Sequence, residues 1–314
     1  MNYQPAMMNR RPELEIPGTP GPTSATTVAC PYCNGSSYLF ISSADLNRQI
    51  TTEVFQYFRC SKCDLVFLHP VPEDLGKFYQ GGYQPIPRSI SQLRRIAKSE
   101  EYRMQSVLRY KNGGRLLEIG PWMGIFSSNA KDAGFEVTTI EMNRECVDFL
   151  NNVVNITAIQ SNDPAATMGA MDENFDVIVL WHSLEHLNKP WLVLQKAAER
   201  LSPGGILLIA VPNIESYDFS VLKECWYHLD APRHLRFYTA QWLEKICSTN
   251  GLNMLEMKTN DQLSKILSKD AWYVRAASIV RVKYLTGILS RLLRIFAMKR
   301  SKGNNSGITA IFSK

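Results

Sequence analysis

The chain has 314 residues, which is long enough for one large and one small domain. Its hydrophobic fraction of 45% is ordinary for a soluble globular protein. Its net charge of +6 is uneven, because residues 262–302 carry ten Lys or Arg and a single acid, Asp270. Residues 28–86 hold four basic and five acidic side chains. This balance argues against a nucleic-acid clamp in that segment.

The N-terminal segment 1–27 contains Pro, Thr, Asn and Arg but no apolar core of signal-peptide length. We therefore expect a flexible tail and no export signal. Of the seven cysteines, Cys146, Cys225 and Cys247 have no partner spacing, which suits a reducing compartment. These features predict a cytoplasmic protein.

The other four cysteines form two CxxC pairs, Cys30 with Cys33 and Cys60 with Cys63, separated by 26 residues. Four thiolates make a closed tetrahedral site without an open position, so we expect a structural Zn²⁺. A segment this small cannot hold itself together by apolar burial alone, and a metal would supply the missing stability. Two unconnected CxxC turns are the alternative.

The expected secondary structure changes character along the chain. Short strands are predicted around the cysteines at 37–42, 54–59 and 65–68, and a connecting helix at 91–110. From residue 114 strands and helices alternate, which predicts an α/β fold with a Rossmann-like parallel sheet. The strands expected there are 115–119, 136–140, 156–159, 175–180, 206–211, 252–258 and 307–312. The helices are 126–133, 144–153, 190–201 and 239–250.

This pattern divides the chain into six parts. They are a flexible tail (1–27), a zinc ribbon (28–86), a helical linker (87–112), a cofactor-binding domain (113–260), a basic amphipathic insert (261–303) and a final strand (304–314). The insert could lie on an anionic membrane surface as a peripheral contact, but it lacks an 18-residue apolar run and so does not span. The interpretation we favour is a helical lid that covers the sheet or the active site, with a solvated basic face.

A glycine loop follows the first strand of the predicted sheet. The strand runs into Gly120, and Gly124 stands at the head of a helix, which lets the backbone approach a ligand closely. Glu141, 21 residues after Gly120 and at the end of the next strand, is placed to accept hydrogen bonds from ribose hydroxyls. The alternative is a βα turn of another α/β protein, with Glu141 capping a helix.

The loop sequence, Glu118-Ile119-Gly120-Pro121-Trp122-Met123-Gly124, resembles the acidic-then-glycine motif of class I S-adenosylmethionine-dependent methyltransferases. In that family the strand-end acid supports the loop around the methionine part of the cofactor, and the position of Trp122 is usually glycine. The resemblance implies S-adenosylmethionine as cofactor. The residues it implies for cofactor binding are Glu118, Gly120, Trp122, Gly124, Glu141 and Trp181.

Residues 175–187 resemble the fourth-strand segment of the branch that carries a Leu-Glu-His signature, here Leu184-Glu185-His186. The ubiquinone-biosynthesis O-methyltransferases belong to this branch. Residues 201–205, 211–213 and 232–234 fit the same branch. The similarity covers about 116–252.

Methyl transfer from a sulfonium is an in-line displacement, so the protein positions the acceptor and removes the proton of a hydroxyl. Histidines 182, 186, 228 and 234 follow the fourth and fifth strands, in loops at the carboxyl edge of the sheet. The spacing of His182, Glu185 and His186 puts them on one face of a helical turn. We expect His186 as general base, Glu185 orienting it and His182 contacting the acceptor. A structural role for His186 is the alternative.

The ubiquinone-biosynthesis enzymes bind a divalent cation through two carboxylates and a histidine at the positions that match 182, 185 and 186. Here His182 stands where the first carboxylate would be. A nitrogen ligand suits magnesium less well. We therefore expect a general base at this site and keep a metal as the alternative.

Cys63-Asp64-Leu65-Val66-Phe67, with Pro70 and Pro72 after it, resembles the zinc-ribbon preamble of bacterial methyltransferases that act on sugars or cell-surface glycans. We therefore expect methylation of a hydroxyl on a sugar, a glycan or a small metabolite. One alternative is an RNA methyltransferase, which the acidic ribbon and the absence of an Asn-Pro-Pro-Tyr motif disfavour. The other is a cofactor-binding protein that has lost catalysis, suggested by Trp122 and His182.

Overall fold

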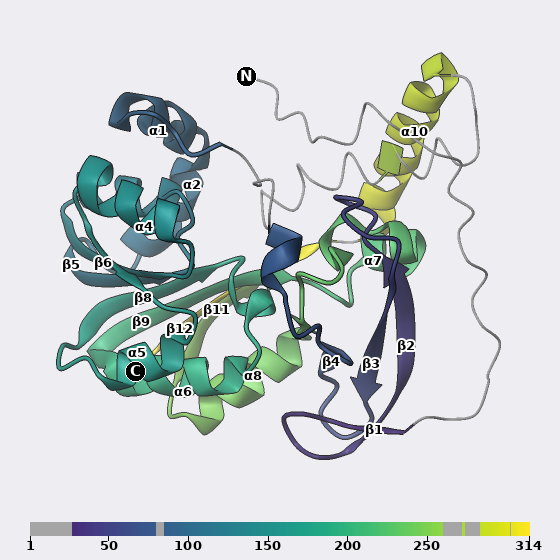
Figure 1. The fold of residues 1–314 in the computed structure, drawn as a ribbon, viewed down its shortest axis with the longest axis horizontal. Coiled ribbons are helices and arrows are strands. Elements are labelled where there is room, and N and C mark those ends of the chain that lie inside the picture. The colour runs from purple at the N-terminus through teal and green to yellow at the C-terminus, as the bar shows by residue number, and fades with distance from the viewer. Residues whose placement is uncertain (1–26, 80–84, 260–271, 274–282, 302) are drawn as a thin grey trace. The chain divides into compact units, whose positions relative to one another are not determined.

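The computed structural model describes residues 27–79, 85–259, 272–273, 283–301 and 303–314, which form two compact units (Figure 1). The cysteine unit comprises Met1–Gln80, Pro212–Thr239 and Asn260–Gly307, and the Rossmann unit comprises Gly81–Val211, Ala240–Thr259 and Ile308–Lys314. The predicted tail, except residue 27, lies outside the described residues. So does the predicted insert, except 272–273, 283–301 and 303.

The Rossmann unit is built on a seven-stranded sheet of order β11-β12-β9-β8-β5-β6-β7. Neighbours from β9 to β7 pair in parallel, whereas β11 and β12 pair antiparallel. This arrangement confirms the predicted Rossmann-like α/β fold. The strands are β5 (Gly114–Ile119), β6 (Phe135–Glu141), β7 (Thr157–Gln160), β8 (Phe175–Trp181), β9 (Leu201–Pro212), β11 (Asn253–Lys258) and β12 (Gly307–Ser313).

Helices cover both faces of this sheet, with α1, α2 and α4 on one side and α5, α6 and α8 on the other (Figure 1). Strand β8 is accordingly buried at every position except Asp176, as its continuous apolar run predicts. The helices are α1 (Ile90–Ala97), α2 (Glu101–Leu108), α3 (Ile125–Asp132), α4 (Arg144–Phe149), α5 (Pro164–Gly169), α6 (Pro190–Arg200) and α8 (Ala240–Thr249).

The single helix predicted over 91–110 is wrong, because α1 and α2 are separate. A 3-10 turn, Lys98–Glu100, interrupts them, and within it the Ser99 hydroxyl donates to the carbonyl of Ile96 over 2.7 Å. Such side-chain bonds compete with the regular helix ladder. Helix α4 likewise ends earlier than predicted and continues as a π-helical turn, Leu150–Val154.

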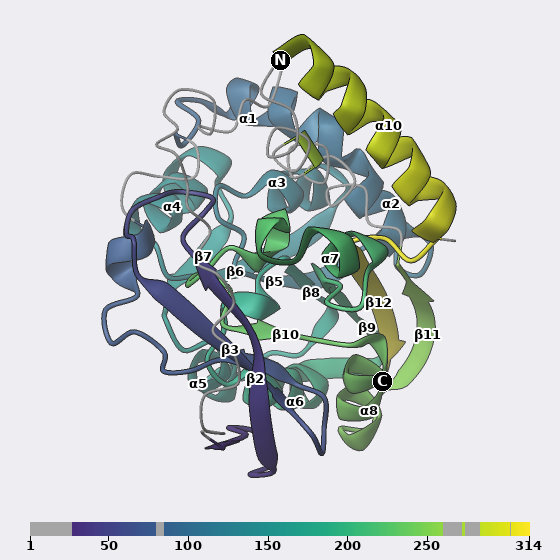
Figure 2. The ribbon, with the colours of Figure 1, turned by 90° about the vertical axis from the view of Figure 1, so that its right-hand side faces the viewer.

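The cysteine unit contains a five-stranded antiparallel sheet, in which β2 and β3 form the long hairpin of Figure 2. Helix α10 packs against α7 in this unit. The strands are β1 (Val28–Ala29), β2 (Ser36–Ala44), β3 (Val54–Cys60), β4 (Val66–Leu68) and β10 (Arg236–Phe237), and the helices are α7 (Tyr217–Leu222) and α10 (Lys283–Ser301). Short 3-10 turns lie at Gly76–Tyr79, Lys223–Cys225 and Tyr227–Leu229.

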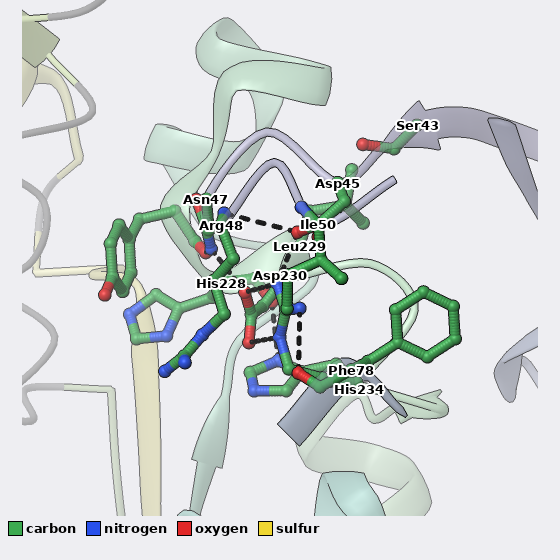
Figure 3. Close-up of polar contacts among 12 residues, drawn as sticks. Ser43, Asp45, Asn47, Arg48, Ile50, Phe78, His228, Leu229, Asp230 and His234 are labelled. Carbon is green, nitrogen blue, oxygen red and sulfur yellow. Dashed lines mark hydrogen bonds and ion pairs between the residues drawn. The ribbon is translucent and has the colours of Figure 1, made fainter. Parts of the chain in front are cut away.

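A buried ion cluster joins the β2–β3 connection to the segment that precedes β10 (Figure 3). The guanidinium of Arg233 donates to Asp45 over 2.6 Å and to Asp230 over 2.7 and 3.0 Å. The Asn47 amide also donates to Asp230, over 2.7 Å. Burial alone would raise the pKa of Asp230, but the Arg233 guanidinium holds that pKa well below its usual range. Asp230 is therefore ionised, and the cluster fixes the 228–234 segment to the hairpin.

Candidate cofactor site and cysteine cluster

The glycine loop between β5 and α3 has the left-handed backbone that its sequence predicts. The φ angles are 72° at Gly120 and 78° at Gly124. A Cβ on Gly120 would lie 2.7 Å from Cβ of Ser183, and one on Gly124 would lie 2.4 Å from Leu150 Cδ2. Both positions therefore require glycine, for conformation and for space.

Trp122 occupies the loop position at which the resembled family usually has glycine. Its φ of 52° is also left-handed, so the loop keeps the same kind of backbone despite the change of residue. A side chain in this region costs about 1 kcal/mol or more. The indole is partly buried and packs against the core of the Rossmann unit. This packing is the structural compensation for the strained backbone.

Glu141 connects the end of β6 to the glycine loop. Its Oε2 accepts a hydrogen bond from the Trp122 amide at 3.0 Å, and its Oε1 accepts one from the Asn143 amide at 2.8 Å. Burial raises the pKa of Glu141, and hydrogen bonds from the backbone amides of Asn143, Trp122 and Met142 oppose that shift. Asn143, and not Glu141, caps α4, because its side chain accepts from the Cys146 amide. A carboxylate has about four lone-pair sites, so Glu141 can accept a further donor.

Glu118 lies buried beneath the same loop, at the end of β5. Burial raises the pKa of Glu118 to about 7, although a hydrogen bond from the Ser127 hydroxyl and the charge of Arg103 oppose the shift. A buried carboxyl with a pKa near 7 is stabilised in its charged form by a cation placed beside it. The site thus fits a positively charged ligand.

Trp181 and Arg103 lie together at the end of β8. The Trp181 ring is buried against Phe126, with ring centroids 5.7 Å apart, and the Arg103 guanidinium lies 5.3 Å from the indole centroid. Arg103 also pairs with Glu100 at 2.9 Å. The Trp181 Nε1 is buried, and no described residue accepts its hydrogen. An indole donor of this kind is suited to a ligand oxygen or nitrogen.

The structure places His182, Glu185 and His186 around a 3-10 turn, Leu184–His186, that follows β8. His182 has a φ of 51°, and its Nδ1 lies 3.6 Å from Oε1 of the fully buried Glu185. His186 is partly buried, and one of its ring nitrogens lies within 4.8 Å of a Glu185 carboxylate oxygen. His182 and Glu185 are therefore neighbours. The other two histidines of the predicted set, His228 and His234, belong to the cysteine unit.

The four predicted zinc ligands converge in the cysteine unit. Their Sγ atoms all lie within 4.8 Å of one another, with 3.7 Å between Cys30 and Cys63 and 3.5 Å between Cys33 and Cys60. Sulfurs that share a tetrahedral Zn²⁺ are about 3.8 Å apart, whereas a disulfide brings them to about 2 Å. The four thiols are unbridged and fit a zinc site.

The two CxxC turns have matching backbone geometry. The Asn34 amide donates to Cys30 O at 3.0 Å, and the Asp64 amide donates to Cys60 O at 3.1 Å. Asn34 and Asp64 both have left-handed φ angles, of 55° and 61°. A Cβ on Gly35 would lie 2.9 Å from Lys62 Cβ, so this glycine lets the turns approach each other. The pairs thus form one cluster and not two unconnected turns.

A family model described as a methyltransferase domain matches residues 92–257, which is more than half of the chain. The chain belongs to this family. The matched residues include the glycine loop, both candidate acids Glu118 and Glu141, and the Leu184–His186 turn. The first cysteine pair and the second lie outside them.

The chain is similar to ubiquinone biosynthesis O-methyltransferases. The Vibrio cholerae protein is 29% identical over 130 residues, which are 38% of this chain and 53% of the relative. The Paramagnetospirillum magneticum protein is 27% identical over 157 residues, 45% of this chain and 63% of the relative. The chain thus spans about half the length of the curated relatives it matches.

Among solved structures, a SAM dependent methyltransferase from Archaeoglobus fulgidus superposes with a TM-score of 0.50. It is 17% identical, and the match covers 70% of this chain and 94% of that protein. This likeness supports the fold.

None of the helices in the described part of the chain is long and apolar enough to cross a bilayer.

Arg103 is the main site residue that sequence reasoning missed. It precedes the glycine loop on α2 and belongs to no recognisable motif. Only the packing of α2 against α3 brings it beside Trp181. The basic side chain on a predicted linker helix gave no signal that distinguished it from a solvated surface residue.

Proposed function

We propose that this protein transfers a methyl group from S-adenosylmethionine to a hydroxyl of a small metabolite, sugar or glycan. The observation that carries the proposal is the left-handed glycine loop tied to Glu141 above the buried Glu118. Family membership supports methyl transfer, and the names of the curated relatives support an oxygen acceptor. The resemblance of the cysteine segment to ribbons of glycan-modifying enzymes supports the sugar or glycan.

The residues that would hold the cofactor are those of the loop and its surroundings. We propose that Gly120, Trp122 and Gly124 shape the loop, while Glu141 accepts ribose hydroxyls through its remaining lone pairs. Glu118 would carry its negative charge near the cationic end of the ligand. Bound S-adenosylmethionine supplies an electrophilic methyl group on a sulfonium.

Two further side chains extend the proposed cofactor site. Trp181 offers its buried Nε1 donor, and Arg103, stacked on the same indole, offers a planar guanidinium suited to a carboxylate. An amino-acid ligand carries both an ammonium and a carboxylate. The pairing of the acidic Glu118 with the basic Arg103 in one region matches that charge pattern.

We propose that His186 removes the proton of the acceptor hydroxyl, that Glu185 orients it and that His182 contacts the acceptor. The buried Glu185 carboxyl lies 3.6 Å from His182, and its ligand oxygen lies within 4.8 Å of a ring nitrogen of His186, which supports a role in fixing both imidazoles. Half-burial of His186 leaves its ring accessible to an acceptor. A general base of this kind contributes roughly a hundredfold or more to the rate.

The cysteine cluster is proposed to bind a structural Zn²⁺. Four thiolates saturate the metal, so the ion would stabilise the β1–β4 sheet and take no part in the chemistry. The scattered Cys146, Cys225 and Cys247 form no disulfide, which supports a cytoplasmic location.

The proposal is tested by transfer of labelled methyl groups to a panel of sugars, glycans and phenolic or aliphatic hydroxyl compounds. The wild type should methylate at least one oxygen acceptor, and His186→Ala should lose turnover while keeping cofactor affinity. His69→Ala, an exposed histidine of the cysteine unit, is the matched control and should keep turnover. Turnover by His186→Ala would place the base elsewhere. Failure to bind S-adenosylmethionine would reject the function.

A further inference from the structure

Helix α10 exposes a stripe of large apolar side chains. Leu285, Ile288, Leu292, Ile295 and Phe296 are each between 43% and 59% exposed. Their spacing of three or four residues places them along one side of the helix. Five such side chains in a row on one helix are more than the scattered exposure of single apolar residues that is normal for a surface.

The opposite side of α10 faces the protein with small residues. Thr286, Ser290 and Ala297 are buried, and Ala297 and the partly buried Leu293 join the core of the cysteine unit. A surface helix normally turns its large apolar side chains inward. In α10 this arrangement is reversed, so packing among the described residues of the unit does not explain its apolar stripe.

Basic residues accompany the stripe. The α10 sequence contains Lys283, Arg291, Arg294, Lys299 and Arg300 and no Asp or Glu. Arg291, Lys299 and Arg300 are exposed, and the Arg300 guanidinium lies 5.0 Å from the ring centroid of the exposed Phe296. Apolar side chains flanked by cations on the same helix match the interface between acyl chains and anionic headgroups.

We propose that α10 is a membrane-docking helix that lies on an anionic phospholipid surface, with Leu285, Ile288, Leu292, Ile295 and Phe296 inserted at the headgroup boundary. Charge complementarity selects this occupant. A second copy of the chain, paired through the same face, would bring two helices together that each carry five cations and no acid. Lipid phosphates neutralise those cations instead. Membrane docking is a function separate from methyl transfer, because it would bring the enzyme to acceptors at a membrane.

The test is co-sedimentation of the full chain with vesicles, which needs neither cofactor nor acceptor. The chain should bind vesicles of phosphatidylglycerol and phosphatidylcholine in equal parts, and binding to phosphatidylcholine alone should be much weaker. Ile288→Glu with Leu292→Glu should weaken binding by roughly tenfold or more for each side chain. Leu192→Glu, at an exposed leucine of α6, should bind as the wild type does. High salt should weaken wild-type binding, because screening acts on the basic side chains.

Three results would overturn the proposal. The first is a wild-type chain that fails to sediment with the anionic vesicles. The second is equal loss of binding in the Leu192→Glu control and the α10 double variant. The third is a lipid-free wild type that elutes as a dimer while the double variant elutes as a monomer, since that would assign the stripe to a second copy. Matching thermal unfolding of all variants shows that each is folded.

Discussion

The backbone amide of Trp122 donates a 3.0 Å hydrogen bond to the Glu141 carboxylate, which joins the glycine loop to the end of β6. The donor belongs to the main chain, so the bond survives replacement of the indole as long as the backbone keeps its left-handed conformation. This hydrogen bond therefore fixes the glycine loop relative to Glu141, the candidate acceptor of ribose hydroxyls. The contact explains how a loop with tryptophan in place of glycine can still form the cradle.

This relationship predicts that two small residues at position 122 lower the stability by different amounts. Both Trp122→Gly and Trp122→Ala lose the packing of the indole, but glycine alone adopts a φ of 52° without strain. The glycine variant should therefore be more stable than the alanine variant by about 1 kcal/mol. Urea unfolding of the two variants measures the difference. An alanine variant of equal or greater stability would contradict the assigned backbone strain.

The cysteine cluster predicts a metal content of one Zn²⁺ per chain. Cys60→Ser removes one of the four convergent thiols and should lose the metal and lower the unfolding temperature of the cysteine unit. Cys225→Ser, at a cysteine outside the cluster, should retain the metal. Elemental analysis of the purified proteins decides the matter. A wild type that folds normally without metal would refute the zinc site.

The Arg233 cluster predicts a large loss of stability when its pairing is broken. Asp45→Ala leaves a fully buried guanidinium with one carboxylate fewer and should cost about 3 kcal/mol. Asp132→Ala breaks an exposed ion pair with Arg94 and should cost less than about 1 kcal/mol. Denaturant titration compares the two. Similar small losses in both variants would show that the buried cluster does not hold the 228–234 segment.

The raised pKa of Glu118 predicts that the free energy of unfolding of the ligand-free protein depends on pH. Because its pKa is raised from 4.5 to about 7, folding favours the protonated carboxyl. The stabilising contribution is full below pH 4.5 and is lost as pH rises through 7. Glu118→Gln should reduce this loss of unfolding free energy with rising pH, which amounts to at most about 3 kcal/mol. Glu141, whose pKa is also raised, keeps a residual slope. An unchanged slope in Glu118→Gln would assign the titration to another group.

Much of the Rossmann unit could be predicted because β8 is a continuous apolar run and because glycines such as Gly134 and Gly251 mark the ends of helices. The observed β8 and β12 differ from the predicted strands by a single residue at one end. The pairing of β10 with β4 could not be predicted, since β10 has two residues and its partner lies far away in sequence. Helix α5 begins with an Asp163 cap followed by proline, and this local signal is sufficient to predict a helix there.

The candidate site was predictable where a motif fixes the backbone and not where tertiary packing selects a side chain. The glycine loop and the cysteine cluster follow from spacing alone. Arg103 and the Asp45–Arg233 pair depend on packing between distant segments, and neither has a local sequence signature. The catalytic roles of residues 182, 185 and 186 and the six domain limits stay predictions.

Isothermal calorimetry with S-adenosylmethionine measures whether the glycine loop and Glu141 bind this cofactor. The wild type should bind, and Glu141→Ala should bind about tenfold more weakly or worse, because a charged acceptor of ribose hydroxyls is lost. Glu136→Ala changes an exposed acid on the same strand and should leave affinity unchanged. Equal affinity of the wild type and Glu141→Ala, or no binding by the wild type, would contradict the account.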